Sequence, residues 1–301
     1  MMDPLLRAAL QSWSWRPEVI VPLLVLGWLY TRGWWVLRHR GRAADGLATY
    51  WRLGSYLGGL FFLAVALLSP IDTLSSFLFS MHMVQHLFMV MFAPPLLMIA
   101  NPLPFILWGL PEMVRHKTGA ALTFAVARES RFRRTFRSLL SPGVTWIIFV
   151  SVLWGWHDPN LYNAALRYSW VHDLEHLTFF ITAMLLWWRI TGAGPKIHHK
   201  LSLLGRVSLL IAGVPPNMML GVFLAFATTP IYSFYEEMPR ITGLSVIQDQ
   251  ALSGIIMWIP GSMMYIVGAL VLLFTWMGHE ELKSKLEKSR PRPPQITPVE
   301  L

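Results

Sequence analysis

Three long runs of this sequence contain no charged side chain: residues 19–30, 57–68 and 255–276. A soluble domain distributes its charges along the whole chain, whereas here only 14% of residues are charged and 54% are hydrophobic. Such runs are solvated by lipid hydrocarbon, and a helix that crosses it needs roughly 20 mainly apolar residues. The sequence therefore predicts an all-α polytopic membrane protein.

Windows of that length predict about seven transmembrane helices in a single domain over residues 1–280. Within the third, Pro94 and Pro95 must kink or end the helix, because proline lacks a backbone donor. Residues 101–111 contain three prolines and are interpreted as an interfacial or re-entrant piece. Residues 281–301 are expected to form a disordered cytoplasmic tail. The predicted spans are 19–37, 53–69, 79–100, 144–156, 170–190, 203–227 and 251–277.

Basic residues are distributed unequally between the two sides of these spans. All of the 25 Lys and Arg residues except Arg7, Arg16, Arg167 and Arg240 fall on the side of the C-terminus. By the positive-inside rule the N-terminus is outside and the C-terminus is cytoplasmic. The net charge of +9 is then a topology signal and not a footprint for nucleic acid. The basic run 128–137 is expected to rest on anionic membrane lipids.

Five of the ten histidines fall near the predicted outer face. His82 and His86 begin the third span, His172 and His176 begin the fifth, and His157 ends the fourth. Each pair has i, i+4 spacing, which places both imidazoles on one face of a helix. Ionisable groups below the membrane interface are costly and usually functional. The pattern predicts a metal or cofactor site.

Several neighbouring side chains are candidate accessory residues. The carboxylates of Asp173 and Glu175 can orient an imidazole, although Glu175 can also point into a neighbouring helix. Asp249 opens the last span, where it can serve the site or simply act as a helix cap. Thioethers near the histidines can stabilise a cuprous ion. The candidates are Met81, Met83, Asp173, Glu175, Asp249 and Met257.

The donor set restricts the ligand. The chain has no cysteine, so thiolate sites are excluded. Imidazole with thioether favours copper, while zinc and iron remain possible on the nitrogens alone. A haem is the alternative, but it takes only two axial ligands and would leave three histidines unused. No nucleophile with a base at defined spacing and no nucleotide fingerprint is present, so the chain is not expected to be an enzyme.

Several short motifs lie in order over about residues 50–280. They are FSMHMVQH at 79–86, APPL at 93–96, WHDP at 156–159 with Tyr162, HDLEH at 172–176, and Asp249-Gln250 followed by Gly254 and Met257-Trp258. With this set the sequence resembles the CtaG-type cytochrome c oxidase assembly factors associated with caa3 oxidases.

The resemblance implies a seven-helix protein of the bacterial plasma membrane that helps to build the copper centre in the oxidase catalytic subunit. The family's histidines carry over onto His82, His86, His157, His172 and His176. The resulting hypothesis is that the cluster accepts copper from an extracytoplasmic donor and passes it to the oxidase. Two alternatives are a haem-binding electron-transfer protein and a metal-free scaffold for oxidase assembly.

Overall fold

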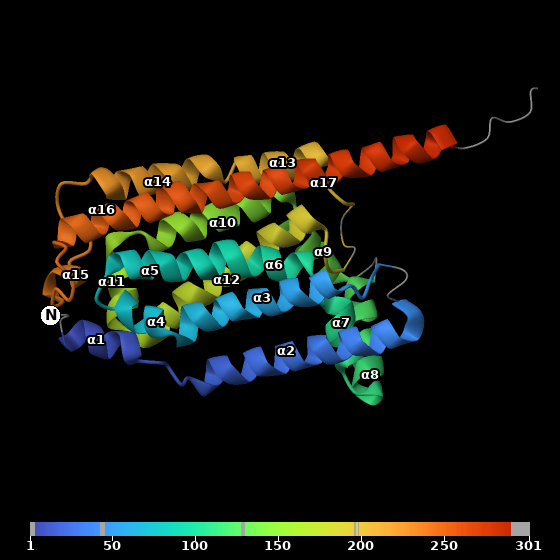
Figure 1. The fold of residues 1–301 in the computed structure, drawn as a ribbon, viewed down its shortest axis with the longest axis horizontal. Helices are drawn as coiled ribbons and strands as arrows, with labels where there is room; N and C mark the ends of the chain where they lie inside the picture. Colours follow the sequence, from blue (N-terminus) through green and yellow to red (C-terminus); the bar gives the residue numbers. More distant parts are fainter. Residues whose placement is uncertain (1–3, 43–45, 128–129, 196, 198, 290–301) are drawn as a thin grey trace, which may run out of the picture.

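The computed structural model describes residues 4–42, 46–127, 130–195, 197 and 199–289. Over these residues the chain is helical, with no β-strand, and its long helices lie side by side in one elongated bundle (Figure 1). Five described helices are long and apolar enough to cross a membrane, or six if the bent pair α9–α10 counts as one span. The all-α membrane class is confirmed; seven spans and the orientation remain predictions.

Six of the predicted spans agree with the observed helices to within three residues, whereas the helix at the last predicted span, 251–277, begins at Val246 and continues to Ser289. The fifth predicted span is present as α12, but two histidines and two carboxylates in its first turns lower its hydropathy, and it is not among the five. The long helices are α2 (Pro17–Leu37), α3 (Tyr50–Leu68), α5 (Phe79–His86) continued by η2 (Leu87–Phe92) and α6 (Ala93–Ile99), α10 (Pro142–Trp156), α12 (Ser169–Thr191), α13 (Leu203–Ile211) with α14 (Val214–Phe226), and α16 (Val246–Ile256) continued by η3 (Met257–Gly261) and α17 (Ser262–Ser289).

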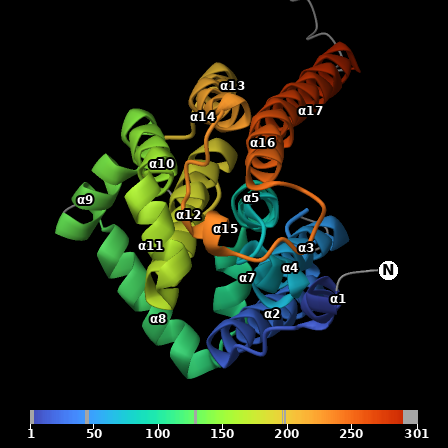
Figure 2. The ribbon, with the colours of Figure 1, turned by 90° about the vertical axis from the view of Figure 1, so that its left-hand side faces the viewer.

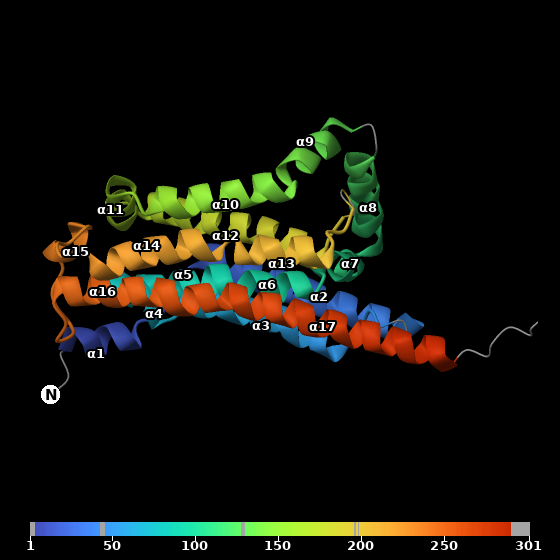
Figure 3. The ribbon, with the colours of Figure 1, turned by 90° about the horizontal axis from the view of Figure 1, so that it is seen from above.

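Short helices close the two ends of the bundle. In Figure 3, α1, α11 and α15 lie at one end, and α7, α8 and α9 lie at the other. The end that carries α11 and α15 is called the histidine end, because α5 begins there. The short helices are α1 (Pro4–Gln11), α4 (Pro70–Ser75), α7 (Pro102–Gly109), α8 (Glu112–Val126), α9 (Arg131–Leu139), α11 (Pro159–Arg167) and α15 (Phe234–Glu237), and π-helix η1 (Arg38–Arg42) follows α2.

The helix α5–η2–α6 is the centre of the bundle. In the end-on view of Figure 2, α5 is surrounded by α3, α12 and α16. Its most apolar window is 67% buried, against 17–39% for the other candidate spans. Pro94 and Pro95 do not end this helix. The π-helix η2 directly precedes them, and the span continues to Ile99. Such π-segments commonly mark functional sites.

Two helix pairs cross closely at glycines. A Cβ at Gly33 of α2 would lie 1.7 Å from the carbonyl oxygen of Phe105 in α7, and one at Gly254 of α16 would lie 2.4 Å from the backbone nitrogen of Ala225 in α14. Small residues permit such backbone contact between membrane helices. The segment 101–111, predicted to be interfacial or re-entrant, is therefore a short helix that packs directly against α2.

The predicted disordered tail requires a correction. Residues 281–289 belong to α17, which is rich in Glu, Lys and Leu, and Lys285 pairs with Glu281 at 2.8 Å. These residues have high helix propensity, and an i, i+4 pair of this kind adds to it. Residues 290–301 lie outside the described residues.

Basic side chains gather at the end opposite the histidine end. Arg133, Arg137, Arg189 and Lys200 line one cavity there, so two of the basic loops meet in space. The sequence placed these loops on a single side of the membrane. Arg128, at the start of the predicted lipid-binding run, lies outside the described residues.

Candidate metal site

The first turn of α5 is held by Asp249 from α16. Its carboxylate accepts hydrogen bonds from the backbone nitrogens of Phe79 at 2.7 Å and Ser80 at 3.2 Å, and from the Ser80 hydroxyl. Asp249 is buried, and the free N–H groups of a helix start favour a carboxylate there. Of the two roles expected for Asp249, it acts as a helix cap, but it caps the neighbouring helix α5 and not its own helix α16. These hydrogen bonds fix the turn that precedes His82.

Four of the five predicted histidines meet around a carboxylate. Ligand atoms of His82, His172 and His176 lie within 4.8 Å of one another, and so do those of His82, His86 and Glu175. The two Nε2 atoms of His82 and His86 are 2.9 Å apart. Each lies 3.8 Å from one oxygen of Glu175. These five residues are called the histidine–glutamate cluster.

Glu175 is the most constrained member of this cluster. Its side chain is 0% exposed, and neither carboxylate oxygen makes a hydrogen bond within the described part of the chain. An unpartnered buried carboxylate is costly, and a bound cation removes that cost. Of the two orientations considered for Glu175, the inward one toward α5 is observed. The set of imidazole nitrogens and carboxylate oxygen suits copper, zinc or iron.

Tyr235 sets the proton position on His82. The Tyr235 hydroxyl donates its proton to the carbonyl of Ser75 at 3.0 Å. It therefore accepts the hydrogen bond of 3.3 Å from Nδ1 of His82, which places the imidazole proton on Nδ1. The lone pair of Nε2 is then directed toward the cluster, as in metal sites whose histidines are oriented by an outer partner.

An aromatic layer covers the cluster at the histidine end. Tyr162 stacks on Tyr232 at 4.0 Å between ring centroids, and Phe79 stacks on Tyr235 at 5.6 Å. Burial raises the pKa of the Tyr162, Tyr232 and Tyr235 hydroxyls, which stay protonated. Tyr232 and Tyr235 were not predicted as site residues, because they lie between two predicted spans, where helical periodicity gives no information. Two tyrosines close together in this connection were the available signal.

His157 lies apart from the other four histidines. Its Nδ1 donates to the carbonyl of Leu153 at 2.7 Å, and its Nε2 is buried without a hydrogen-bond partner in the described chain. With His86, Met83 and Met257 it lines a small separate cavity.

Two accessory candidates point elsewhere. Asp173 accepts two hydrogen bonds from the Arg16 guanidinium, at 2.7 and 2.9 Å, on the surface of the bundle. Met81 packs against a small apolar cluster that contains Leu74 and Leu78. Asp173 belongs to neither of the two groups of close ligand atoms. Asp173 and Glu175 are two residues apart near the start of α12, so they point to different sides of the helix. Asp173 therefore lies at the surface, whereas Glu175 is buried.

A larger cavity reaches the cluster from the side. It has a volume of about 540 Å³ between α2, α3 and α12, and its walls are mainly leucine with Tyr56 and Phe180. His176 lies on its wall, and the Arg16–Asp173 ion pair lies at its rim. The cluster is therefore accessible laterally through an apolar space.

Fold and site together define a class, a polytopic helical membrane protein with a buried histidine–glutamate cluster at one end. Comparison with known proteins identifies the family. The family described as "Cytochrome c oxidase caa3 assembly factor (Caa3_CtaG)" matches residues 28–279. The chain belongs to this family, and the identification made from the short motifs is confirmed. This family is described as one of cytochrome c oxidase assembly factors.

Relatives of the chain occur in mycobacteria. It is 26% identical over 277 residues to proteins of Mycobacterium bovis and Mycobacterium tuberculosis, covering 91% of this chain and 40% of each relative. A protein of Mycobacterium leprae is 26% identical over 265 residues, covering 87% and 39%. All three bear the name "uncharacterized protein". The chain spans about two-fifths of the length of these relatives, and no solved structure matches it.

Proposed function

We propose that the chain binds copper as cargo at the histidine–glutamate cluster and delivers it to the catalytic subunit of cytochrome c oxidase in a bacterial plasma membrane. The observation that carries this proposal is the position of Glu175, whose fully buried carboxylate lies beside the Nε2 atoms of two histidines and has no hydrogen-bond partner among the described residues. A cation supplies the missing partner. Imidazole and carboxylate also suit zinc and iron, but copper is favoured because the proposed recipient is the copper centre of the oxidase catalytic subunit.

The ligand geometry favours a transfer site over a structural one. Two three-ligand groups share His82, so an ion can exchange between them without leaving the cluster. A structural site instead encloses its ion in one closed ligand set. The chain acts by binding and handing over an ion, not by catalysing a reaction.

Access to the cluster suggests a direction for the transfer. The histidine end is the predicted outer end, so an extracytoplasmic donor would load copper there, past the aromatic layer. The apolar cavity between α2, α3 and α12 reaches His176. Delivery would then run laterally to an oxidase subunit within the membrane.

Haem fits the site less well. The ring of His86 on α5 lies 5.4 Å from the ring of His176 on α12 at their centroids and packs against Phe179, which leaves no slot for a macrocycle between these two helices. The remaining alternative is a metal-free scaffold. It predicts that alanine variants of the histidines support oxidase assembly, whereas bulky changes on lipid-facing helix surfaces abolish it.

The proposal is tested by complementation. A strain that lacks this protein would express the natural chain, His82→Ala/His86→Ala, or the control His279→Ala, whose exposed ring on α17 donates a hydrogen bond to the Thr275 carbonyl far from the cluster. We expect oxidase activity and oxidase copper to be lost only with the double variant, at equal amounts of membrane-inserted protein. Full activity with the double variant would refute copper delivery.

A further inference from the structure

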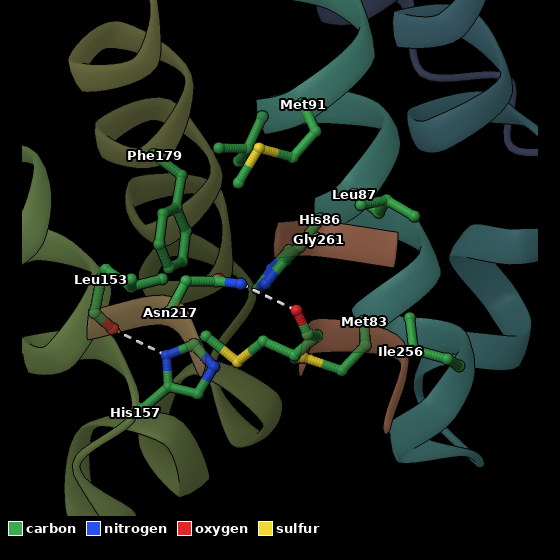
Figure 4. Close-up of a pocket in the computed structure, with 12 residues that line it drawn as sticks. Met83, His86, Leu87, Met91, Leu153, His157, Phe179, Asn217, Ile256 and Gly261 are labelled. Atoms are coloured by element: carbon green, nitrogen blue, oxygen red, sulfur yellow. Dashed lines mark hydrogen bonds between the residues drawn. The ribbon is translucent and has the colours of Figure 1, made fainter. Parts of the chain in front are cut away.

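A second set of possible metal ligands, which includes thioether sulfurs, lies next to the histidine–glutamate cluster and shares His86 with it. It lines a small cavity of about 40 Å³ between the π-segments η2 and η3 and the helices α5, α10, α12 and α14. Figure 4 shows Met83, Met91, His86 and His157 around this space. A cavity of this size has room for an ion and a water molecule. The ligand-bearing residues on its wall are Met83, His86, Met91, His157 and Met257.

His157 provides the first argument that this cavity binds something. Its side chain is more than nine-tenths buried, and the hydrogen bond from Nδ1 to Leu153 leaves the lone pair on Nε2. Nε2 is directed away from Leu153 in Figure 4 and has no partner in the described chain. Leaving a buried acceptor without a partner costs about 1–3 kcal/mol. An ion bound in the cavity would remove this cost.

The methionines provide the second argument. Buried methionines are usually packing groups, but here three of them, two from the helix α5–η2 and one from η3, line one small cavity together with two histidines. Met91 lies within η2 and Met257 begins η3, so both are placed where a helix departs from α geometry. Asn217 donates to the Met257 carbonyl at 2.8 Å and so supports this irregular turn.

We propose that this cavity is a cuprous ion site, distinct from the histidine–glutamate cluster and coordinated by thioethers and by Nε2 of His157. Thioether with imidazole selects the soft Cu(I) ion, whereas the nitrogen and oxygen atoms of the cluster accept divalent ions as well. His86 belongs to the cluster and also lines the cavity, so an ion that leaves the cluster can bind next in the cavity. This inference rests on the proposed function and adds a second site and an oxidation state to it.

The test uses Ag(I), a redox-inert ion with the ligand preference of Cu(I). Detergent-purified protein would be titrated with Ag(I) and, separately, with Zn(II), for the natural chain and for Met83→Leu/Met257→Leu. Exchange of Met for Leu nearly conserves volume and costs less than about 1.5 kcal/mol per site. The matched control is Met89→Leu/Met184→Leu, because these methionines line the larger cavity instead.

We expect Met83→Leu/Met257→Leu to weaken Ag(I) binding at least tenfold and to leave Zn(II) binding unchanged, while the control binds both ions normally. Copper-edge X-ray absorption of Cu(I)-loaded protein should show a sulfur shell that this variant loses. Equal Ag(I) affinity in all three proteins, or no Ag(I) binding at all, would overturn the proposal. The variant Glu175→Gln distinguishes this proposal from the proposed function of the cluster, because it should weaken Zn(II) binding and leave Ag(I) binding unchanged. Ag(I) binding by a natural chain that binds no divalent ion would refute metal binding at the cluster and leave the cavity site standing.

Discussion

Glu175→Gln gives the sharpest prediction for the cluster. The exchange keeps the size of the side chain and removes its charge. In the metal-free protein the carboxylate lies buried beside imidazoles and has no hydrogen-bond partner in the part of the chain that the structure describes, so removal of its charge relieves a cost. In the metal-bound protein the same exchange removes a ligand. The variant should therefore be at least as stable as the natural chain without metal and should gain less from metal.

The size of the effect follows from the distances. Glu175 lies 3.8 Å from the Nε2 atoms that would share its ion. A pair of unit charges 4 Å apart contributes about 4 kcal/mol at an effective dielectric constant of about 20. Part of this is offset by solvation, so we expect about 100-fold weaker binding, or about 2.7 kcal/mol. An ion present at 100 times its dissociation constant stabilises the natural chain by about 2.7 kcal/mol, and the variant by only about 0.4 kcal/mol.

The assay is the unfolding temperature of detergent-purified protein with and without the metal ion. Asp173→Asn is the control, because this carboxylate lies two residues away on the same helix but pairs with Arg16 at the surface. We expect the control to keep the full metal-induced shift. A Glu175→Gln protein that is less stable without metal, or that keeps the full shift, would contradict the assigned role of this carboxylate.

Three further substitutions test how the site is positioned. Asp249→Ala leaves three buried donors of the first turn of α5 without an acceptor, and we expect about 3 kcal/mol or more of lost stability, with Asp249→Asn intermediate, measured by thermal unfolding. Tyr235→Phe frees Nδ1 of His82 and should weaken metal affinity about tenfold by titration, whereas unchanged affinity would remove Tyr235 from the site. Gly254→Ala forces α14 and α16 apart and should cost about 1–3 kcal/mol, while Gly278→Ala, with open space around it, should not lower the unfolding temperature.

The sequence predicted the parts of the site that depend on helical spacing. Each i, i+4 pair fixed two imidazoles on one face, and the apolar runs fixed which ends of the helices share a membrane face. The meeting of the pair on α5 with the pair on α12 follows from these two regularities. The structure places four of the five histidines together on this basis.

Tertiary packing determined what the sequence left open. The choice between an inward Glu175 and a surface Asp173 depends on how α12 is rotated against α5, which periodicity alone does not fix. Asp249 reaches across to another helix because α16 packs beside the start of α5. His157 ends α10, and its ring turns toward the methionine-lined cavity when Nδ1 bonds back to Leu153. None of these contacts has a local sequence signal.

Copper binding by the histidine–glutamate cluster is tested most directly by metal analysis of the purified protein. Protein would be isolated in detergent from copper-supplemented cells, and its copper, zinc, iron and haem content would be measured for the natural chain and for His82→Ala/His86→Ala. We predict copper in the natural chain, markedly less in the variant, and no haem absorption band in either. Equal copper in both proteins, its absence from the natural chain, or stoichiometric haem would contradict the account.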